Sequence, residues 1–163
     1  MTLTLGTIRD HDPCEPGWRT LTKTLGTIDP TTELSIGDVV LSNGLADALW
    51  CLGCLEPRQR IAAIMPSVRR ASALTADQRV HDCIAAIDRW LAGDDTVYLR
   101  KAARAAWEAS AARAARAAGE AGVASAARAA GEARAALGPD ERDRQIADLL
   151  AMFPPIRMKE KAS

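Results

Sequence analysis

Residues 101–137 read KAARAAWEASAARAARAAGEAGVASAARAAGEARAAL and contain 20 alanines in 37 positions. Alanine has the highest helix propensity, whereas a disordered tail is expected to be richer in Pro, Ser and Gln and in net charge. On a helix, at about 100° per residue, the alanines form one continuous stripe, and Arg113, Arg116 and Glu120 lie opposite it. The tract therefore predicts a helix with a smooth seam against which another helix can pack closely.

The length of this tract limits how it can fold. An uninterrupted helix over 96–137 would be about 60 Å long, whereas a compact domain of this size is roughly 40 Å across. Gly119 and Gly122 each disfavour a helix interior by about 1 kcal/mol relative to alanine. We therefore favour a helical hairpin broken at Gly119–Gly122 over one long helix. The same seam could also pair two chains as a homodimer.

The rest of the chain repeats apolar residues at helical spacing and almost nowhere alternates them as a strand does. We predict an all-α protein, a compact helical bundle that forms a single domain over 1–155. Its predicted parts are acidic N-terminal helices within 1–56, basic helices within 57–137, a final helix over 140–153 and a flexible tail over 156–163. Three basic and eight acidic residues give 1–56 a charge of −5, and thirteen basic and eight acidic residues give 57–137 a charge of +5.

Glycine and proline place two boundaries in the first half of the chain. Asn43-Gly44 is expected to end a short helix over 34–41, because glycine and asparagine are common just past helix C-termini. Pro66 lies inside an apolar helical stripe, where its missing N–H is expected to kink or break the helix.

Two further patterns predict helix starts. Thr75 and Gln78 have the spacing of a capping box in front of an apolar stripe. The pentapeptide TLGTI occurs at 4–8 and again at 24–28, and we expect both copies to begin a helix.

The bulk composition excludes several classes of protein. The formal net charge is zero, which argues against an acidic DNA mimic and against a generally basic nucleic-acid binder. No run of about 18 apolar residues and no N-terminal secretion signal occur, so we expect a cytoplasmic protein without a membrane partner. Its four cysteines are then expected to be reduced and mostly buried.

The sequence offers few groups for catalysis. Cys51 and Cys54 have the Cys-x-x-Cys spacing of a redox dithiol or of half a zinc site, but they lie at the end of an apolar helix and no other ligands occur at paired spacing. We expect them to pack in the core and predict no metal and no cofactor. His11 and His81 are the only histidines, and neither lies in a recognisable nucleophile arrangement. The prediction is a protein that is not an enzyme.

The predicted partner-binding surface is the arginine face of the alanine tract, with a second basic spot in the preceding helices. Tryptophan beside arginine is typical of hot spots in protein interfaces. Aromatic residues that could stack on bases are scarce in the tract, which makes direct nucleic-acid binding the weaker prediction. The candidate residues are Trp107, Arg113, Arg116 and Glu120, with Arg69 and Arg70 as the second spot.

Two segments carry a family resemblance. IRDHDPCEPGWRTL at 8–21 and SNGLADALWCL at 42–52, followed by helices and an alanine-rich tract, resemble a family of small proteins encoded by phages and prophages. This chain has Gly53 where many members continue with arginine, and its tract holds fewer tryptophans. The layout is also similar to that of helical, alanine-rich immunity proteins.

The resemblance implies a phage or prophage accessory protein that works in the cytoplasm of a bacterial host. We expect it to bind and inhibit a bacterial host protein or a defence complex such as a CRISPR effector. The alternatives are an immunity protein that neutralises a cognate toxin and a helical nucleic-acid-binding protein.

Overall fold

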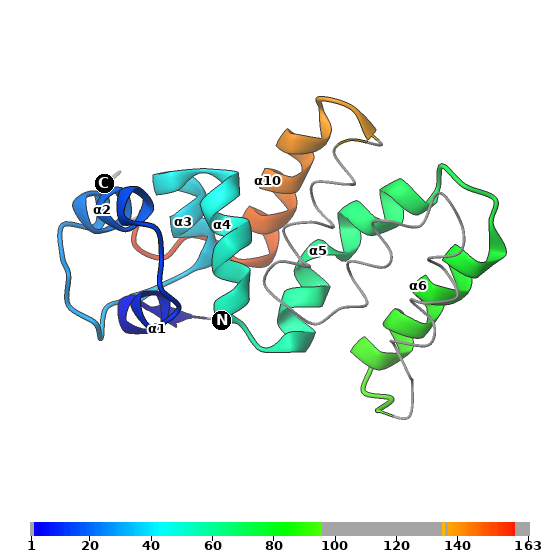
Figure 1. Cartoon of the computed structure of the whole chain (residues 1–163), viewed down its shortest axis with the longest axis horizontal. Helices are drawn as coiled ribbons and strands as arrows, with labels where there is room; N and C mark the ends of the chain where they lie inside the picture. The colour runs from blue at the N-terminus through cyan, green and yellow to red at the C-terminus, as the bar shows by residue number, and fades with distance from the viewer. Residues whose placement is uncertain (1, 96–134, 136, 159–163) are drawn as a thin grey trace.

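The computed structural model describes residues 2–95, 135 and 137–158. Within this part of the chain, seven α-helices enclose a hydrophobic core, and two strands of two residues each form a minor sheet (Figure 1). The prediction of an all-α protein is confirmed. The choice between one long alanine helix and a hairpin at Gly119–Gly122, and the homodimer seam, fall outside the described residues.

The helices lie in three groups along the long axis of the molecule. In Figure 1, α3 (Ile36–Asn43), α4 (Leu45–Cys51) and α10 (Glu141–Met152) occupy the middle. One end holds α1 (Leu5–Asp10) and α2 (Glu15–Leu25), and the other holds α5 (Pro57–Ser72) and α6 (Gln78–Leu91). A short 3-10 turn, η1 (Leu52–Cys54), joins α4 to the loop before α5. The largest side chains that are almost wholly buried include Leu34, Leu45, Leu52, Ile61, Ile87 and Phe153.

The N-terminal segment is fastened by backbone pairing. β1 (Leu3–Thr4) runs antiparallel to β2 (Glu33–Leu34), with Leu3 opposite Leu34. Thr4 then caps α1, since its hydroxyl accepts a hydrogen bond from the amide of Thr7 at 3.1 Å. The first TLGTI copy therefore begins a helix, as predicted.

The second TLGTI copy does the opposite, so that prediction is wrong. Thr24 and Leu25 are the last residues of α2, and Gly26 at φ 74° is its C-cap. A left-handed residue stops a helix that is already formed, and glycine adopts that conformation without steric cost.

The boundary between α3 and α4 confirms the predicted stop at Asn43-Gly44. Gly44 has φ 85° and lies between the two helices. α3 begins two residues later than predicted, because Ser35 and Asp38 form a capping box at its start. The amide of Asp38 donates to the hydroxyl of Ser35 at 3.1 Å, and the amide of Ser35 donates to the carboxylate of Asp38 at 2.8 Å.

Of the kink or break predicted at Pro66, the break does not occur, because α5 continues past it to Ser72. Proline removes one backbone hydrogen bond from the helix. The residues on both sides of it, including Ile61, Met65 and Val68, are buried in the core. This burial on both flanks holds the helix together across the missing bond.

The predicted capping box of Thr75 and Gln78 is also wrong. Asp77 is the N-cap of α6, and its carboxylate accepts from the amide of Arg79 at 2.9 Å. Gln78 instead donates to Asp82 at 2.9 Å. Aspartate is at least as good a cap as threonine, and here it is the residue next to the helix.

The chain after α10 is held against α3, which differs from the flexible tail predicted from 156 onward. The amides of Ile156, Arg157 and Met158 donate to the carboxylate of Asp38 at 3.2, 3.0 and 3.0 Å. Asp38 is fully buried, so these amides supply the hydrogen bonds of a carboxyl group that has no contact with water. The first three residues of the predicted tail thus belong to the domain.

Candidate functional site

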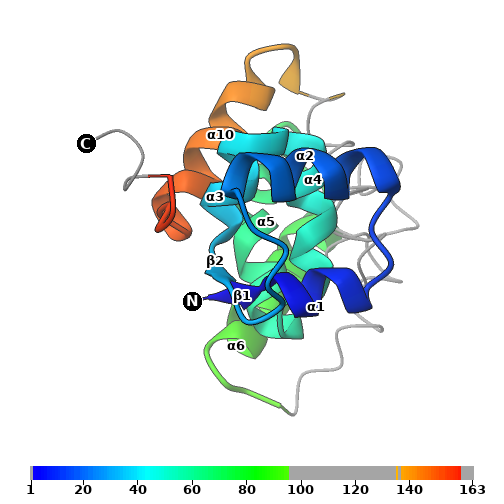
Figure 2. The same cartoon turned by 90° about the vertical axis from the view of Figure 1, so that its left-hand side faces the viewer.

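A hollow of about 240 Å³ opens between α1, α2, α3 and α4. Figure 2 looks onto α1 and α2, with α4 behind α2. One part of the lining comes from the segment 8–21, namely Ile8, Pro13, Cys14, Gly17, Trp18 and Leu21. The other part is Val39 with Asn43, Ala46, Asp47, Trp50 and Cys51. The two segments that carry the family resemblance therefore meet here.

The lining residues follow the helical repeat on both walls. On the α2 wall they recur at positions 14, 17, 18 and 21, and on the α4 wall at 46, 47, 50 and 51, while Asn43 is the last residue of α3. Within each wall the residues are three or four positions apart or adjacent, as on a single helix face. Each wall is thus one stripe of a helix, and both stripes are mainly apolar.

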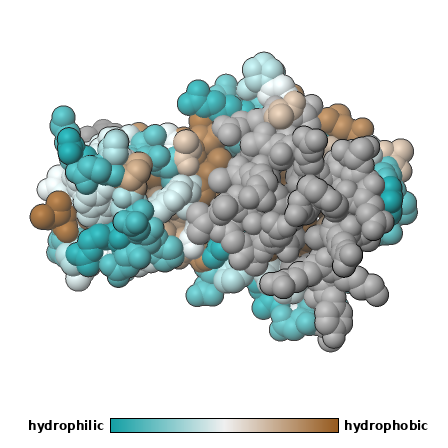
Figure 3. All heavy atoms as spheres, viewed as in Figure 1, coloured by the Kyte–Doolittle hydropathy of each residue, from teal (hydrophilic) through white to brown (hydrophobic). Residues whose placement is uncertain are grey.

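The size and surroundings of the hollow favour a small ligand. Pockets for drug-sized molecules measure ~300–1,000 Å³, so this volume suits a single side chain or a small organic group. Trp18 and Trp50 are both half-buried. In the space-filling view, the surface over α1 and α2 is mostly hydrophilic or intermediate (Figure 3).

Asn43 ties the two walls together. Its side-chain amide donates to the carbonyl of Gly17 at 2.8 Å and to the carboxylate of Asp47 at 2.8 Å. Its own oxygen accepts from the hydroxyl of Ser42 at 2.7 Å. A Cβ atom on residue 17 would lie 2.8 Å from an Asp47 oxygen, so a larger residue there would displace the Asp47 side chain. The hollow is therefore a built feature with a fixed polar edge.

Asp47 is the acidic group of the hollow. It is half-buried, and the amide of Asn43 is its hydrogen-bond donor. Within residues 2–95, 135 and 137–158, no lysine, arginine or histidine lies within salt-bridge distance of it. The amide of Asn43 is a neutral donor, so it satisfies one oxygen of Asp47 without balancing its charge. The residues that the structure describes supply no cation for that charge.

The thiols do not form a reactive dithiol. Burial raises the pKa of Cys51 far above its ordinary value, with further contributions from Cys54 and Asp47, and burial raises the pKa of Cys54 to about 11. Redox-active Cys-x-x-Cys motifs have lowered pKa values. The expectation that Cys51 packs in the core is confirmed, and Cys54 is half-buried at its edge. Cys14, on the rim of the hollow, is the exposed cysteine.

Both histidine rings face backbone carbonyls. His11 Nδ1 lies 2.9 Å from the oxygen of Thr7, and His81 Nε2 lies 2.9 Å from the oxygen of Thr75. Across the described residues, no three His, Cys, Asp or Glu side chains are placed to hold a metal ion. In the same part of the chain, no helix combines the length and the apolar character needed to cross a membrane.

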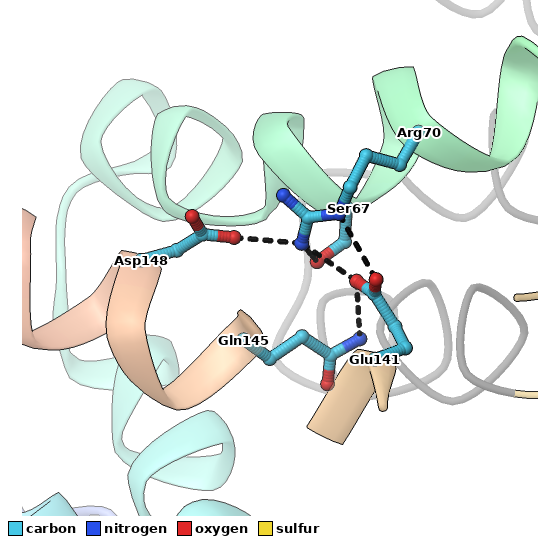
Figure 4. Close-up of polar contacts among 5 residues, drawn as sticks. All are labelled: Ser67, Arg70, Glu141, Gln145 and Asp148. Carbon is cyan, nitrogen blue, oxygen red and sulfur yellow. Dashed lines mark hydrogen bonds and ion pairs between the residues drawn. The ribbon is translucent and has the colours of Figure 1, made fainter. Parts of the chain in front are cut away.

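The structure places Arg70 in an internal ion-pair network and not in a free basic spot (Figure 4). Its guanidinium donates to both oxygens of Glu141 at 2.7 and 2.9 Å and to Asp148 at 2.7 Å. Glu141, the first residue of α10, is fully buried. The network therefore joins α5 to α10.

The pKa values of this pair follow from its contacts. Burial acts to raise the pKa of Glu141, but hydrogen bonds from Arg70 and Ser67 and the charge of Arg70 outweigh it, so the pKa is lowered. The hydrogen bond to Glu141 raises the pKa of Arg70. Both groups are charged at neutral pH, and each stabilises the charge of the other.

Arg69, the neighbour of Arg70, also has an intramolecular partner. It forms an ion pair with Asp88 of α6, and its side chain is 53% exposed. The other four predicted partner-binding residues, Trp107, Arg113, Arg116 and Glu120, lie outside the described residues, so the arginine face stays a prediction.

A third arrangement pairs tryptophan with arginine at the far end of the molecule. The guanidinium of Arg58 lies over the ring of Trp90, 4.9 Å from its centroid. It also donates to the carbonyl of Trp90 at 3.1 Å and pairs with the carboxylate of Asp95. Here an aromatic ring and a carboxylate together hold one guanidinium.

The prediction of a partner surface missed the hollow because it looked for charge. The signal that could have found it is the tryptophan on one helical face of each resemblance segment, with Asp47 on the same face as Trp50 in the second. Comparison with protein-family models, with curated proteins and with solved structures finds no match to this chain.

Proposed function

We propose that this protein acts by binding a partner protein and that the hollow between α2 and α4 receives a side chain of that partner. The observation that carries the proposal is an apolar-lined hollow of about 240 Å³ with two half-buried tryptophans on its walls. Tryptophan is enriched at the energetic centres of protein interfaces, where one anchor residue fills a matching pocket.

The chemistry at the hollow supports binding over catalysis. Burial keeps Cys51 protonated, so its thiol is a poor nucleophile at neutral pH. The nearest histidine in sequence, His11, hydrogen-bonds to the carbonyl of Thr7. Asp47 accepts a hydrogen bond from the side-chain amide of Asn43. Among the residues that the structure describes, it contacts no histidine or other base that it could orient for catalysis.

The class of partner in this proposal comes from the resemblance of 8–21 and 42–52 to phage and prophage proteins. An accessory protein of that origin acts in the bacterial cytoplasm and inhibits a host protein, with a defence complex such as a CRISPR effector as the leading target. That both resemblance segments line the hollow supports placing the interaction there.

The test is an affinity pull-down of the tagged protein from bacterial lysate that contains an active defence system, with nuclease treatment. The deciding variant is Ala46→Phe, since Ala46 lies on the hollow and is exposed, so a larger side chain occupies the opening without entering the core. Ala85→Phe is the matched control, because Ala85 is an exposed alanine on α6, away from the hollow.

We expect the wild type and Ala85→Phe to retain one protein complex after nuclease, and Ala46→Phe to lose at least about nine-tenths of it, since filling a hot-spot pocket costs 1.4 kcal/mol or more. Equal retention by all three would contradict the proposal and favour the arginine face. Retention that disappears with nuclease would favour nucleic acid, and recovery of a toxin would favour an immunity protein.

A further inference from the structure

We propose that the hollow recognises an arginine side chain of the partner, with the carboxylate of Asp47 as its counter-ion and the rings of Trp18 and Trp50 as its walls. This inference rests on the proposed function and specifies the chemistry of the residue that enters. It uses three features of the site: an acidic group without a described cation, two aromatic side chains, and a small volume.

The first feature is the state of Asp47. One of its oxygens accepts from Asn43, and no cation from the described residues approaches either oxygen within salt-bridge distance. A cation that enters the hollow can form charge-assisted hydrogen bonds with this half-buried carboxylate. An anionic ligand would be repelled and a purely apolar one would leave the charge unmatched.

The second feature is the pair of tryptophans. An arginine guanidinium is planar, stacks on aromatic faces and is more weakly hydrated than the ammonium of lysine. Its three methylenes would contact the apolar lining, while its charged end reaches the acidic edge. Aromatic walls next to a carboxylate therefore match arginine better than any other side chain.

The same protein already contains an occupied site of this kind. Arg58 lies 4.9 Å from the centroid of the Trp90 ring and pairs with Asp95. In the hollow, the aromatic and acidic components are present and the described residues supply no guanidinium. The comparison indicates that a guanidinium is the group that fits the hollow.

The charge around the hollow points the same way. Residues 1–56, which provide every lining residue, carry a net charge of −5. A negative surface attracts cationic groups and raises the rate at which they arrive. The proposed partner presents an exposed arginine within a basic surface.

The test measures binding of two small probes by NMR titration of the whole protein. The cationic probe is N-acetyl-arginine amide and the neutral probe is N-acetyl-citrulline amide, which has the same shape without the charge. N-acetyl-lysine amide separates arginine from cations in general. Asp47→Asn removes the charge and keeps an oxygen that can accept from Asn43. Asp10→Asn is the matched control, because Asp10 is an exposed acid of α1 that does not line the hollow.

We expect the arginine probe to bind the wild type about tenfold more tightly than the citrulline probe, with shifts at Trp18 and Trp50. The preference should disappear in Asp47→Asn and persist in Asp10→Asn. Equal binding of both probes, binding of neither, equal binding of the lysine probe, or a preference that survives Asp47→Asn would each overturn the inference.

The pull-down separates this inference from the function on which it rests. If Ala46→Phe loses the partner and Asp47→Asn keeps it at the wild-type level, the hollow binds a protein and the assignment of arginine is wrong. If neither variant loses the partner, the proposed function itself fails.

Discussion

Two regions of the molecule combine tryptophan with a carboxylate, and they differ in what completes them. At the α5–α6 end, Arg58 covers Trp90 and pairs with Asp95. At the α1–α4 end, Trp18 and Trp50 line a hollow whose Asp47 has only the amide of Asn43 as its described donor. The first region is complete within the chain, whereas the second has room and charge for an external group.

The difference separates the charges that stabilise the fold from a charge available for binding. Glu141, like Asp95, has an arginine partner, and it is fully buried between α5 and α10. Asp38 is also fully buried and is satisfied by five hydrogen bonds from Ser35 and the C-terminal segment. Replacing a carboxylate that already has partners within the chain should therefore lower the stability of the fold. Replacing Asp47 should instead weaken the binding of the partner protein.

The largest effect is expected at Glu141. Replacing it with alanine leaves the guanidinium of Arg70, which is only 27% exposed, with Asp148 as its remaining carboxylate. We expect Glu141→Ala to lower the free energy of unfolding by about 3 kcal/mol, because it removes two charge-assisted hydrogen bonds from a largely shielded guanidinium and leaves it with one carboxylate in place of two. Urea denaturation followed by circular dichroism measures this. A loss below about 1 kcal/mol would show that the network contributes little.

The contribution of Glu141 should depend on pH. Its folded-state pKa lies below the ordinary value of 4.5, so its ionised form stabilises the fold above that pH, and the stabilisation is lost as the pH falls through the lower folded-state value. We expect the stability difference between the wild type and Glu141→Gln to be constant from pH 7 to about pH 5 and to shrink below it. A difference that stays constant down to pH 3 would contradict the assigned role of the carboxylate.

A smaller effect is expected at the completed tryptophan site. Arg58→Ala removes a stacked guanidinium, a hydrogen bond to the carbonyl of Trp90 and a surface ion pair, and Arg58 is 41% exposed. Together these contacts are worth about 1–2 kcal/mol. The matched control is Arg19→Ala, since Arg19 is 75% exposed and pairs only with Glu15 among the described residues; its loss should stay below about 0.5 kcal/mol. If Arg58→Ala and Arg19→Ala lowered the free energy of unfolding equally, the Trp90 site would be no more stabilising than an ordinary surface ion pair.

The smallest effect on stability is expected at Asp47. Asp47→Asn keeps an acceptor for Asn43 and removes one charge from the first turn of α4, so the free energy of unfolding should change by less than about 1 kcal/mol. The comparison with Glu141→Gln is direct, because both variants convert a carboxylate to an amide. If Asp47→Asn destabilised the protein as much as Glu141→Gln does, Asp47 would be a structural group.

The fold class was predictable because helical spacing runs through most of the chain, but local boundaries depended on context. The two TLGTI copies have identical sequences, yet Thr4 is the last residue of β1 and caps α1, while Thr24 lies at the end of α2 and Gly26 stops that helix. A pentapeptide does not specify which of these occurs. The helix that enters the second copy decides it, and that information lies outside the five residues.

The candidate site was less predictable than the fold. Arg70 is a basic residue in the sequence, and only the structure shows that Glu141, 71 positions away, neutralises it. The hollow likewise needs the approach of Gly17 to Asp47, which joins two segments that are separate in sequence. The helical stripes on its walls were visible in the sequence, but such stripes usually pack in a core. How closely α2 approaches α4 in the folded chain determines that these two stripes leave a hollow between them.

The most direct measurement of the central claim is the rate at which Cys14 is alkylated by iodoacetamide. Cys14 lines the hollow and is the exposed one of the four cysteines. At a saturating concentration of N-acetyl-arginine amide, the account predicts that the rate falls at least about fivefold, since a ligand bound at nine-tenths occupancy or more shields the thiol. At the concentration that gives nine-tenths occupancy by the arginine probe, the citrulline amide, which binds about tenfold more weakly, should occupy about half of the molecules and slow alkylation only about twofold. An alkylation rate that the arginine probe does not alter, although that probe binds the protein, would show that the hollow is not the binding site.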